Sequence, residues 1–140
     1  MAEGIGKPSK AKLRKWERLT TEKYRRREGL LLAEGEKVVG ELFRSGRSAE
    51  AILVSEGKEA RLQDILAGFP AEIPIFRLTQ SEWMTLSQDP SPEGVMAVGA
   101  ARPVSKPAAR LLIETGPLLL LYQVNNPNNL GALFRTAHWF

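Results

Sequence analysis

Short apolar runs alternate with segments of helical periodicity along the first hundred residues. The runs expected to form strands cover residues 30–33, 51–54, 73–76 and 95–100. Apolar residues recur with helical spacing over 34–45, 59–67 and 79–86. Strands that alternate with helices at this spacing need crossover connections. The pattern therefore predicts an α/β fold, in which helices cover both faces of a small, at least partly parallel sheet.

The predicted helices and strands have recognisable ends. Gly46 and Gly68 stop the first two helices, and Thr79 with Glu82 has the spacing of a capping box that opens the third. Pro74 favours an edge strand or the start of a strand. The helix residues expected to pack against the sheet are Val38, Val39, Leu42, Phe43, Leu62, Ile65, Leu66, Trp83 and Leu86.

The first 27 residues differ from the rest of the chain. Residues 1–9 have no periodicity and are expected to be a flexible end. From Lys10 onward, Leu13, Trp16 and Leu19 form an apolar stripe among cationic residues, which predicts a short amphipathic helix with a basic outer face. Another basic turn, residues 23–27, is expected after the threonines at 20 and 21.

Charge separates this segment from the remainder. Residues 1–27 carry a balance of +7 and residues 28–140 a balance of −3, within a total of +4. A basic segment that includes Trp16 and Tyr24 suits a polyanion such as RNA. The alternative is a solvated basic helix face that contacts no partner. The candidate RNA-binding residues are Lys23, Arg25, Arg26, Arg27, Lys37 and Arg44.

Composition excludes several classes of protein. There is no cysteine, so there is no disulfide framework, thiol nucleophile or cysteine metal site. No apolar run is long enough to cross a bilayer, and the N-terminus is too polar for a signal peptide. No carboxylate pair or metal-ligand spacing is present. We expect a cytoplasmic protein with no membrane contact and no metal.

A second region follows the alternating segment. Residues 87–94 are dense in turn formers and are interpreted as a connector. The prolines in 102–107 mark a linker, a short helix is expected at 108–114, and the apolar run 118–124 predicts a buried strand. The expected organisation is a basic arm at 1–27, one domain at 28–101, a linker at 102–116 and the start of another domain at 117–140.

The stretch 126–137 is the strongest candidate for chemistry. Its three asparagines, one proline and one glycine predict a polar turn at a helix start, after the expected strand. Arg135 follows Gly131 by four positions and would point toward the same turn. Without further information, Arg135 is a helix-surface residue and Asn129 a helix cap. His138 is the only histidine and is expected to be packed or exposed rather than catalytic.

These residues resemble the first signature motif of the SpoU/TrmH family of RNA ribose 2′-O-methyltransferases, in the SPOUT superfamily. The motif reads approximately Asp-x-Pro-x-Asn-x-Gly-x-x-x-Arg-Thr-Ala. The matching residues are Pro127, Asn129, Gly131, Arg135, Thr136 and Ala137. Asn126 departs from the usual aspartate, which keeps the turn-forming side chain but loses the charge.

Shorter matches extend the resemblance upstream. The segment Lys23-Tyr24-Arg25 looks like the family's basic lead-in, residues 31–35 like its strand that ends in Glu-Gly, and residues 91–95 like its "spQG" turn. The resemblance implies a small three-layer α/β/α substrate-binding domain with the fold of kink-turn-binding ribosomal proteins. The first βα unit of a truncated SPOUT trefoil-knot domain would follow it.

The resemblance also implies a function. The chain would be the N-terminal portion of an RNA 2′-O-methyltransferase that uses S-adenosylmethionine, with ribosomal RNA as the favoured substrate. Asn129 would position the ribose hydroxyl, and Arg135 would activate it. A guanidinium pKa above about 12 makes arginine a poor base, so Arg135 could instead grip the adjacent phosphate.

The family's second and third motifs build the cofactor site and the dimer interface, and these 140 residues contain neither. We therefore expect this chain to lack the cofactor site and to be inactive alone, while the full-length protein forms a homodimer. The main alternative is a stand-alone RNA-binding module without catalysis. A small phosphate-binding enzyme is a weaker alternative, because no phosphate-loop spacing is present.

Overall fold

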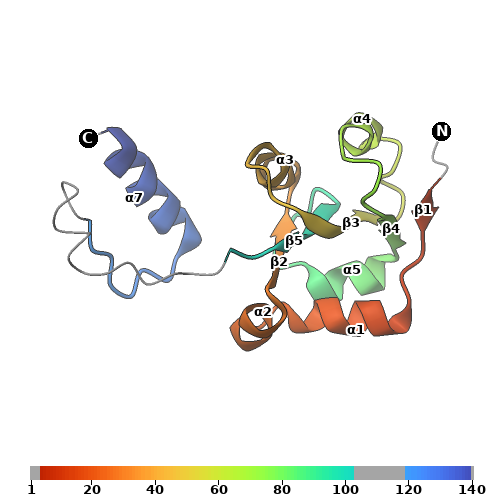
Figure 1. Cartoon of the computed structure of the whole chain (residues 1–140), viewed down its shortest axis with the longest axis horizontal. Coiled ribbons are helices and arrows are strands. Elements are labelled where there is room, and N and C mark those ends of the chain that lie inside the picture. Colours follow the sequence, from red (N-terminus) through yellow and green to blue (C-terminus); the bar gives the residue numbers. More distant parts are fainter. Residues whose placement is uncertain (1–3, 103–118, 140) are drawn as a thin grey trace. The chain divides into compact units, whose positions relative to one another are not determined.

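The computed structural model describes residues 4–102 and 119–139, which belong to two separate units. The first unit contains a five-stranded sheet and five helices (Figure 1). Its elements are β1 (Ile5–Gly6), α1 (Lys10–Arg18), α2 (Glu22–Glu28), β2 (Leu30–Glu34), α3 (Glu36–Arg44), β3 (Ala49–Ser55), α4 (Gln63–Ala67), β4 (Ile75–Leu78), α5 (Gln80–Leu86) and β5 (Val95–Ala100). The second unit contains α7 (Pro127–Trp139).

The sheet is mixed, and its strand order is β1-β4-β3-β5-β2. β4 runs parallel to both β1 and β3, whereas β5 runs antiparallel to both β3 and β2. Ile52 of β3 lies opposite Ile75 on one side and Ala97 on the other. The predicted partly parallel sheet is therefore confirmed, and the strand expected at 95–100 has the predicted bounds.

Each face of the sheet carries its own core, so the domain has three layers. One core joins Trp16 and Leu19, contributed by α1 and its C-cap, to Trp83 and Leu86 of α5. The other joins α3 to the opposite face through Val39 and Leu42. In Figure 1, α1, α2 and α5 lie on one side of the sheet and α3 and α4 on the other. Burial of alternate strand residues against two helical layers stabilises the fold.

Several predicted local signals are present in the structure. The Thr79 hydroxyl accepts from the main-chain N–H of Glu82, and the Glu82 carboxylate accepts from the N–H of Thr79, so the capping box is complete. Pro74 immediately precedes β4, where its carbonyl accepts from the N–H of Ile52 at 3.0 Å. Proline fits there because this position needs an acceptor and no donor.

The helices predicted after Lys10 are present, but the N-terminal segment is not an arm separate from the domain, and the end expected to be flexible contains a strand. Ile5 and Gly6 pair with Ile75 and Phe76 of β4. Trp16 is completely buried and Leu19 is 1% exposed, both within the main core. Residues 4–27 therefore belong to the folded domain, and a division at residue 27 would cut through its core.

Two helices differ from the prediction in their bounds, and one of them also differs in the residues that it buries. The helix expected at 59–67 is helical only over Gln63–Ala67, although Leu62 is completely buried just before it. The helix expected from Glu34 begins at Glu36, because Glu34 is the last residue of β2. Val38 was expected to pack against the sheet, but it is 48% exposed. The buried stripe of α3 consists of Val39 and Leu42 and is narrower than the apolar pattern predicted.

The strand predicted at 118–124 is not present in its described part. Residues 119–124 form no strand, and α7 follows almost directly at Pro127. An apolar run becomes a strand only when another strand pairs with it, and within the described part of the chain none does. No residue of 119–139 is buried. Residues 103–116 of the linker predicted at 102–116, and the helix expected at 108–114, lie outside the described residues. No helix in 4–102 or 119–139 is long and apolar enough to cross a membrane.

Candidate functional site

Two of the short motifs recognised in the sequence meet at one end of the sheet. Antiparallel pairing of β2 with β5 places Glu34 opposite Met96, which brings the Glu34-Gly35 pair beside the loop 87–94. The Glu34 carboxylate accepts from the Ser87 hydroxyl at 2.6 Å and from the Gln88 N–H at 3.2 Å. Gly35 donates its N–H to the Val95 carbonyl at 3.0 Å. The loop is thus fixed at both of its ends.

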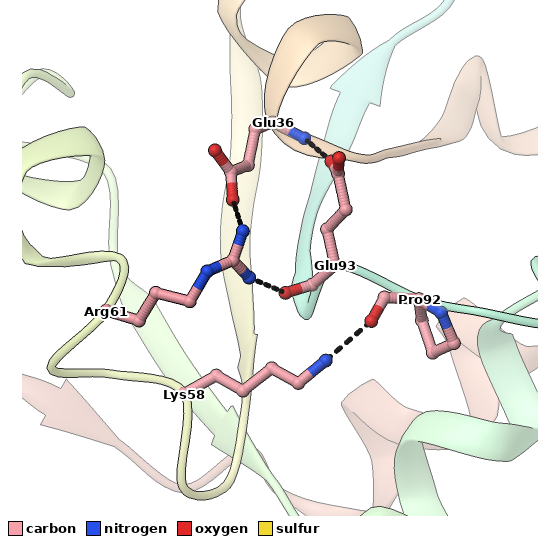
Figure 2. A network of polar contacts seen from close by, with 5 residues as sticks. All are labelled: Glu36, Lys58, Arg61, Pro92 and Glu93. Carbon is pink, nitrogen blue, oxygen red and sulfur yellow. Dashed lines mark hydrogen bonds and ion pairs between the residues drawn. The ribbon is translucent and has the colours of Figure 1, made fainter.

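A third segment, between β3 and α4, holds the same loop (Figure 2). Lys58 Nζ donates to the Pro92 carbonyl at 2.5 Å. The Arg61 guanidinium donates to the Glu93 carbonyl at 3.1 Å and to the Glu36 carboxylate at 2.5 Å. The Glu93 carboxylate in turn accepts from the Glu36 N–H at 2.6 Å. Lys58 and Arg61 were not identified from the sequence, because their partners lie 25 to 34 residues away.

Two glycines allow these loops to approach so closely. Gly35 has φ +98° and Gly94 has φ +94°, which side chains rarely adopt. A Cβ on Gly94 would lie 2.3 Å from Cδ of Lys58, and one on Gly35 would lie 3.1 Å from the Glu93 carboxylate. The loop interpreted as a connector is therefore a clamped turn. Arg61 pairs with Glu36, Lys58 donates to a main-chain carbonyl, and the Glu93 carboxylate accepts from a main-chain N–H. Because all four side chains have partners, the arrangement favours a rigid surface over proton transfer.

The six candidate RNA-binding residues lie on two different faces of the sheet. Lys23, Arg25, Arg26 and Arg27 belong to α2, whereas Lys37 and Arg44 belong to α3, on the opposite side (Figure 1). All except Arg25 are exposed. The structure therefore does not bring the six together into one patch.

The α2 arginines also have partners within the domain. Arg25 donates to the carbonyls of Leu19 and Thr20 at 2.9 Å and so completes the C-terminal end of α1. Arg26 pairs with Glu22 at 2.6 Å, and Arg27 pairs with Glu28 at 2.8 Å. Exposed pairs of this kind are weak, so Arg26 and Arg27 can exchange them for a phosphate. Arg25 is the least available of the three.

Glu50 anchors the cationic face of α1. Its carboxylate accepts from Lys15 Nζ at 2.6 Å and from the Trp16 indole N–H at 3.2 Å. Burial alone would raise the pKa of Glu50. The hydrogen bonds from Lys15 and Trp16, with the charges of Lys15 and Lys12, outweigh burial and hold the pKa below its ordinary value.

The candidate catalytic motif begins α7 rather than forming a loop. Asn126 Oδ1 accepts from the N–H groups of Asn128 and Asn129, at 2.9 and 3.3 Å, and therefore caps the helix. Pro127 is the first helical residue, a position where its missing N–H costs nothing. The N-cap is thus Asn126, the residue that departs from the motif. The sequence without the family resemblance had instead suggested Asn129 as the cap.

Asn129 and Arg135 are both exposed on α7. Six residues of α-helix turn through about 600° and rise about 9 Å, so the two project roughly 120° apart. Gly131 and Arg135 share a face, as predicted. His138, one turn beyond Arg135, is also exposed. No cluster of metal-ligating side chains occurs in residues 4–102 or 119–139.

Comparison with known proteins gives a consistent set of relatives. The family model of the MRM3-like substrate binding domain matches residues 10–97, which run from the start of α1 into β5. The 23S rRNA (guanosine(2553)-2′-O)-methyltransferase RlmP of Bacillus subtilis is 30% identical over 127 residues. That match covers 90% of this chain and 46% of the relative. The chain therefore spans about half the length of this curated relative.

Solved structures agree on the fold. The crystal structure of an RNA 2′-O ribose methyltransferase matches with a TM-score of 0.67 and 20% identity, over 96% of this chain and 51% of that one. The SpoU methyltransferase AviRb of Streptomyces viridochromogenes, in complex with AdoMet, matches with a TM-score of 0.54 and 17% identity. The second match covers 66% of this chain and 33% of AviRb.

Proposed function

We propose that this chain, which belongs to the family of MRM3-like substrate binding domains of SpoU/TrmH proteins, is the RNA-binding part of an RNA ribose 2′-O-methyltransferase. One observation carries the proposal. The family match at residues 10–97 includes the whole of α1 and α2, the two helices on which the basic residues of the domain are concentrated. A substrate-binding domain whose cations gather on two adjacent helices suits a polyanionic substrate.

The proposed substrate is ribosomal RNA. The Bacillus subtilis relative is named for methylation of 23S rRNA, and its match covers 90% of this chain. Phosphate contacts from α2 would supply affinity and position the RNA without reading its sequence. A protein with this substrate would work in the cytoplasm.

The methyl donor is proposed to be S-adenosylmethionine, as in the AdoMet complex of AviRb. The donor supplies the methyl group for transfer to the ribose 2′-oxygen. The motifs that bind it in the family are not among these 140 residues, and the homodimer interface is proposed to lie with them. The residues of this chain that would act on the substrate are Asn129 and Arg135.

Asn129 and Arg135 are assigned to different parts of the nucleotide, because they project in different directions from α7. Asn129 would hold the 2′-hydroxyl through its side-chain amide. Arg135 would grip the neighbouring phosphate in a bidentate fashion and orient the ribose for in-line attack. A guanidinium stays protonated at neutral pH, so in this assignment another group or water takes the hydroxyl proton.

The test uses the protein expressed from its complete reading frame, labelled S-adenosylmethionine and ribosomal RNA. The wild-type protein should transfer methyl groups to a ribose. Arg135→Ala should lower turnover by about a hundredfold because the ribose is no longer oriented. RNA affinity should fall much less, because only one of several phosphate contacts is lost. His138→Ala is the matched control, because His138 is equally exposed one turn away, and it should keep full activity.

Two results would change the assignment. Unchanged turnover in Arg135→Ala would remove Arg135 from the mechanism. RNA binding by the wild-type protein without any methyl transfer would instead support a stand-alone binding module. Deletion of residues 1–27 is not a usable test of RNA binding, since it would remove Trp16 and Leu19 from the core.

A further inference from the structure

A shallow basic hollow lies between α1 and the end of α2, on the face of the domain opposite α3. Its lining residues are Ala11, Arg14, Lys15, Arg18, Arg27 and Glu28, and its volume is about 260 Å³. The four residues from α1 follow the spacing i, i+3, i+4 and i+7, so they form one stripe along the helix. The stripe is distinct from the apolar one that carries Trp16 into the core.

The charges around this hollow are not balanced. Lys15 pairs with Glu50, and Arg27 pairs with Glu28 at 2.8 Å. Arg14 and Arg18 have no carboxylate within ion-pair distance in the described part of the chain. Four cationic side chains and one acidic side chain line the hollow, and Glu50 pairs with one of the cations, Lys15. This leaves a formal excess of two positive charges.

Tyr24 contacts two of the guanidinium groups. Arg18 lies 5.5 Å and Arg27 4.7 Å from the centroid of the Tyr24 ring. Contact with an aromatic ring orients a guanidinium and keeps its N–H edges open to other partners. Two guanidinium groups that contact the same ring attract an anion more strongly than one does.

A purely structural role explains only some of these cations. Lys15 and Arg18 lie in the last turn of α1, and Arg27 in the last turn of α2, where positive charge offsets the helix dipole. Arg14 lies in the middle of α1, so this explanation does not apply to it. Arg14 is also exposed and lies outside the hydrophobic cores.

We propose that this hollow binds a backbone phosphate of RNA, with Arg14 and Arg18 as its principal ligands. The inference rests on the proposed function and specifies which face of the domain meets the RNA. A volume of about 260 Å³ is below the range of small-molecule pockets, which start near about 300 Å³. A phosphodiester crosses such a hollow without being enclosed, and guanidinium groups bind its oxygens in pairs. Contacts of this type position the RNA and do not read its bases.

The test compares two double variants of the full chain in which the same amount of charge is removed. Arg14→Gln with Arg18→Gln removes the proposed ligands, which are exposed, so the fold should persist. Arg47→Gln with Arg102→Gln removes two cations from elsewhere in the domain. Affinity for a short ribosomal RNA hairpin is measured by fluorescence anisotropy over a range of salt concentrations. A third double variant, Arg14→Lys with Arg18→Lys, is measured in the same way. It keeps the two positive charges but removes the planar guanidinium groups.

The glutamine pair at 14 and 18 should weaken binding by about tenfold or more. It should also lower the salt slope by roughly 0.7–0.9 for each phosphate that the variant no longer neutralises. The RNA affinity of the double variant Arg14→Lys with Arg18→Lys should lie between that of the glutamine variant and that of the wild type. The control pair at 47 and 102 should bind nearly as the wild type does. Circular dichroism melting of each variant verifies that it is folded.

Three outcomes are distinguishable. If the wild-type chain does not bind the hairpin at any salt concentration, the proposed function itself fails. If the wild type binds but the 14/18 and 47/102 pairs weaken binding equally, the hollow is not the phosphate site, although the proposed function stands. If a polyglutamate peptide binds more tightly than the RNA, and only when Arg14 and Arg18 are present, the hollow serves an acidic peptide and the inference is wrong.

Discussion

The carboxylate of Glu93 accepts a hydrogen bond of 2.6 Å from the main-chain N–H of Glu36, 57 residues earlier in the chain. The donor is at the start of α3, where the first N–H groups of a helix have no partner within it. Glu93 therefore caps a helix from a distant turn. The bond joins the matched segment 91–95 to the residue that directly follows the matched segment 31–35.

Replacement of Glu93 tests this distant cap. Glu93→Ala removes the acceptor and should lower the free energy of unfolding by about 1 kcal/mol. Glu93→Gln keeps an acceptor oxygen and should have a much smaller effect, and glutamine is the residue at this position of the family's turn. Urea unfolding of both variants measures the difference. Equal destabilisation would mean that the charge of Glu93, rather than its hydrogen bond, holds the turn.

Gly94→Ala should be more destabilising than the same change at Gly46. Both glycines have positive φ, +94° and +70°, so alanine is strained by about 1–2 kcal/mol at either. Only at Gly94 would the new Cβ also overlap Lys58, 2.3 Å from its Cδ, whereas at Gly46 nothing lies within 4 Å. Thermal melting of the two variants should show the larger shift for Gly94→Ala, and Lys58→Ala in the same chain should recover part of it.

Replacement of each of the two buried tryptophans by phenylalanine should lower the free energy of unfolding by different amounts. Trp16 and Trp83 are both completely buried, so the ring volume removed is the same. Trp16 donates its indole N–H to Glu50 at 3.2 Å, whereas the indole N–H of Trp83 finds no acceptor among the described residues. An unpaired buried donor costs about 1–3 kcal/mol. Trp16→Phe should therefore be the more destabilising in urea, by at least about 1 kcal/mol.

Much of the first domain could be predicted from local sequence signals. The bounds of β5 follow from an uninterrupted apolar run, and the start of α5 follows from the capping box at Thr79 and Glu82. The apolar stripe of Leu13, Trp16 and Leu19 predicted the helix α1, although it did not place this helix within the domain. Each of these signals lies within a few residues of the structure that it determines.

Features that depend on distant partners could not be predicted. Ile5 and Gly6 carry no strand pattern and become β1 only because β4, about 70 residues later, offers an open edge. Lys58 and Arg61 are identified only by their contacts with Pro92 and Glu93. For the candidate motif, the sequence predicted the helix and its polar start. The chemical roles of Asn129 and Arg135 came from family resemblance and stay predictions.

The ion pair at Glu50 makes part of the domain's stability depend on pH. Because the pKa of Glu50 is lowered by its partners in the folded state, the ionised form stabilises the fold. This contribution is complete above the unfolded-state pKa of about 4.3 and is lost as the pH falls through the lower folded-state value. Glu50→Gln should remove it. Urea unfolding between about pH 6 and pH 3 should therefore show a steeper acid destabilisation for the wild type than for Glu50→Gln, and parallel curves would contradict the assignment.

The side chain of Asn126 should stabilise the first turn of α7. Its side chain accepts from the N–H groups of Asn128 and Asn129, so Asn126→Ala should weaken the helix start by about 1 kcal/mol. Asn126→Asp, which restores the family residue, keeps both acceptors and adds a negative charge at the positive end of the helix.

Amide hydrogen exchange in the full chain separates these variants at Asn126. Exchange at residues 128 and 129 should be faster than wild type in Asn126→Ala and equal or slower in Asn126→Asp. The matched control is Thr136→Ala. It removes a hydroxyl that donates to the Ala132 carbonyl within the same helix, and it should leave both amides unchanged. Faster exchange in Asn126→Asp would show that the asparagine is needed for its uncharged amide and not only for its oxygen.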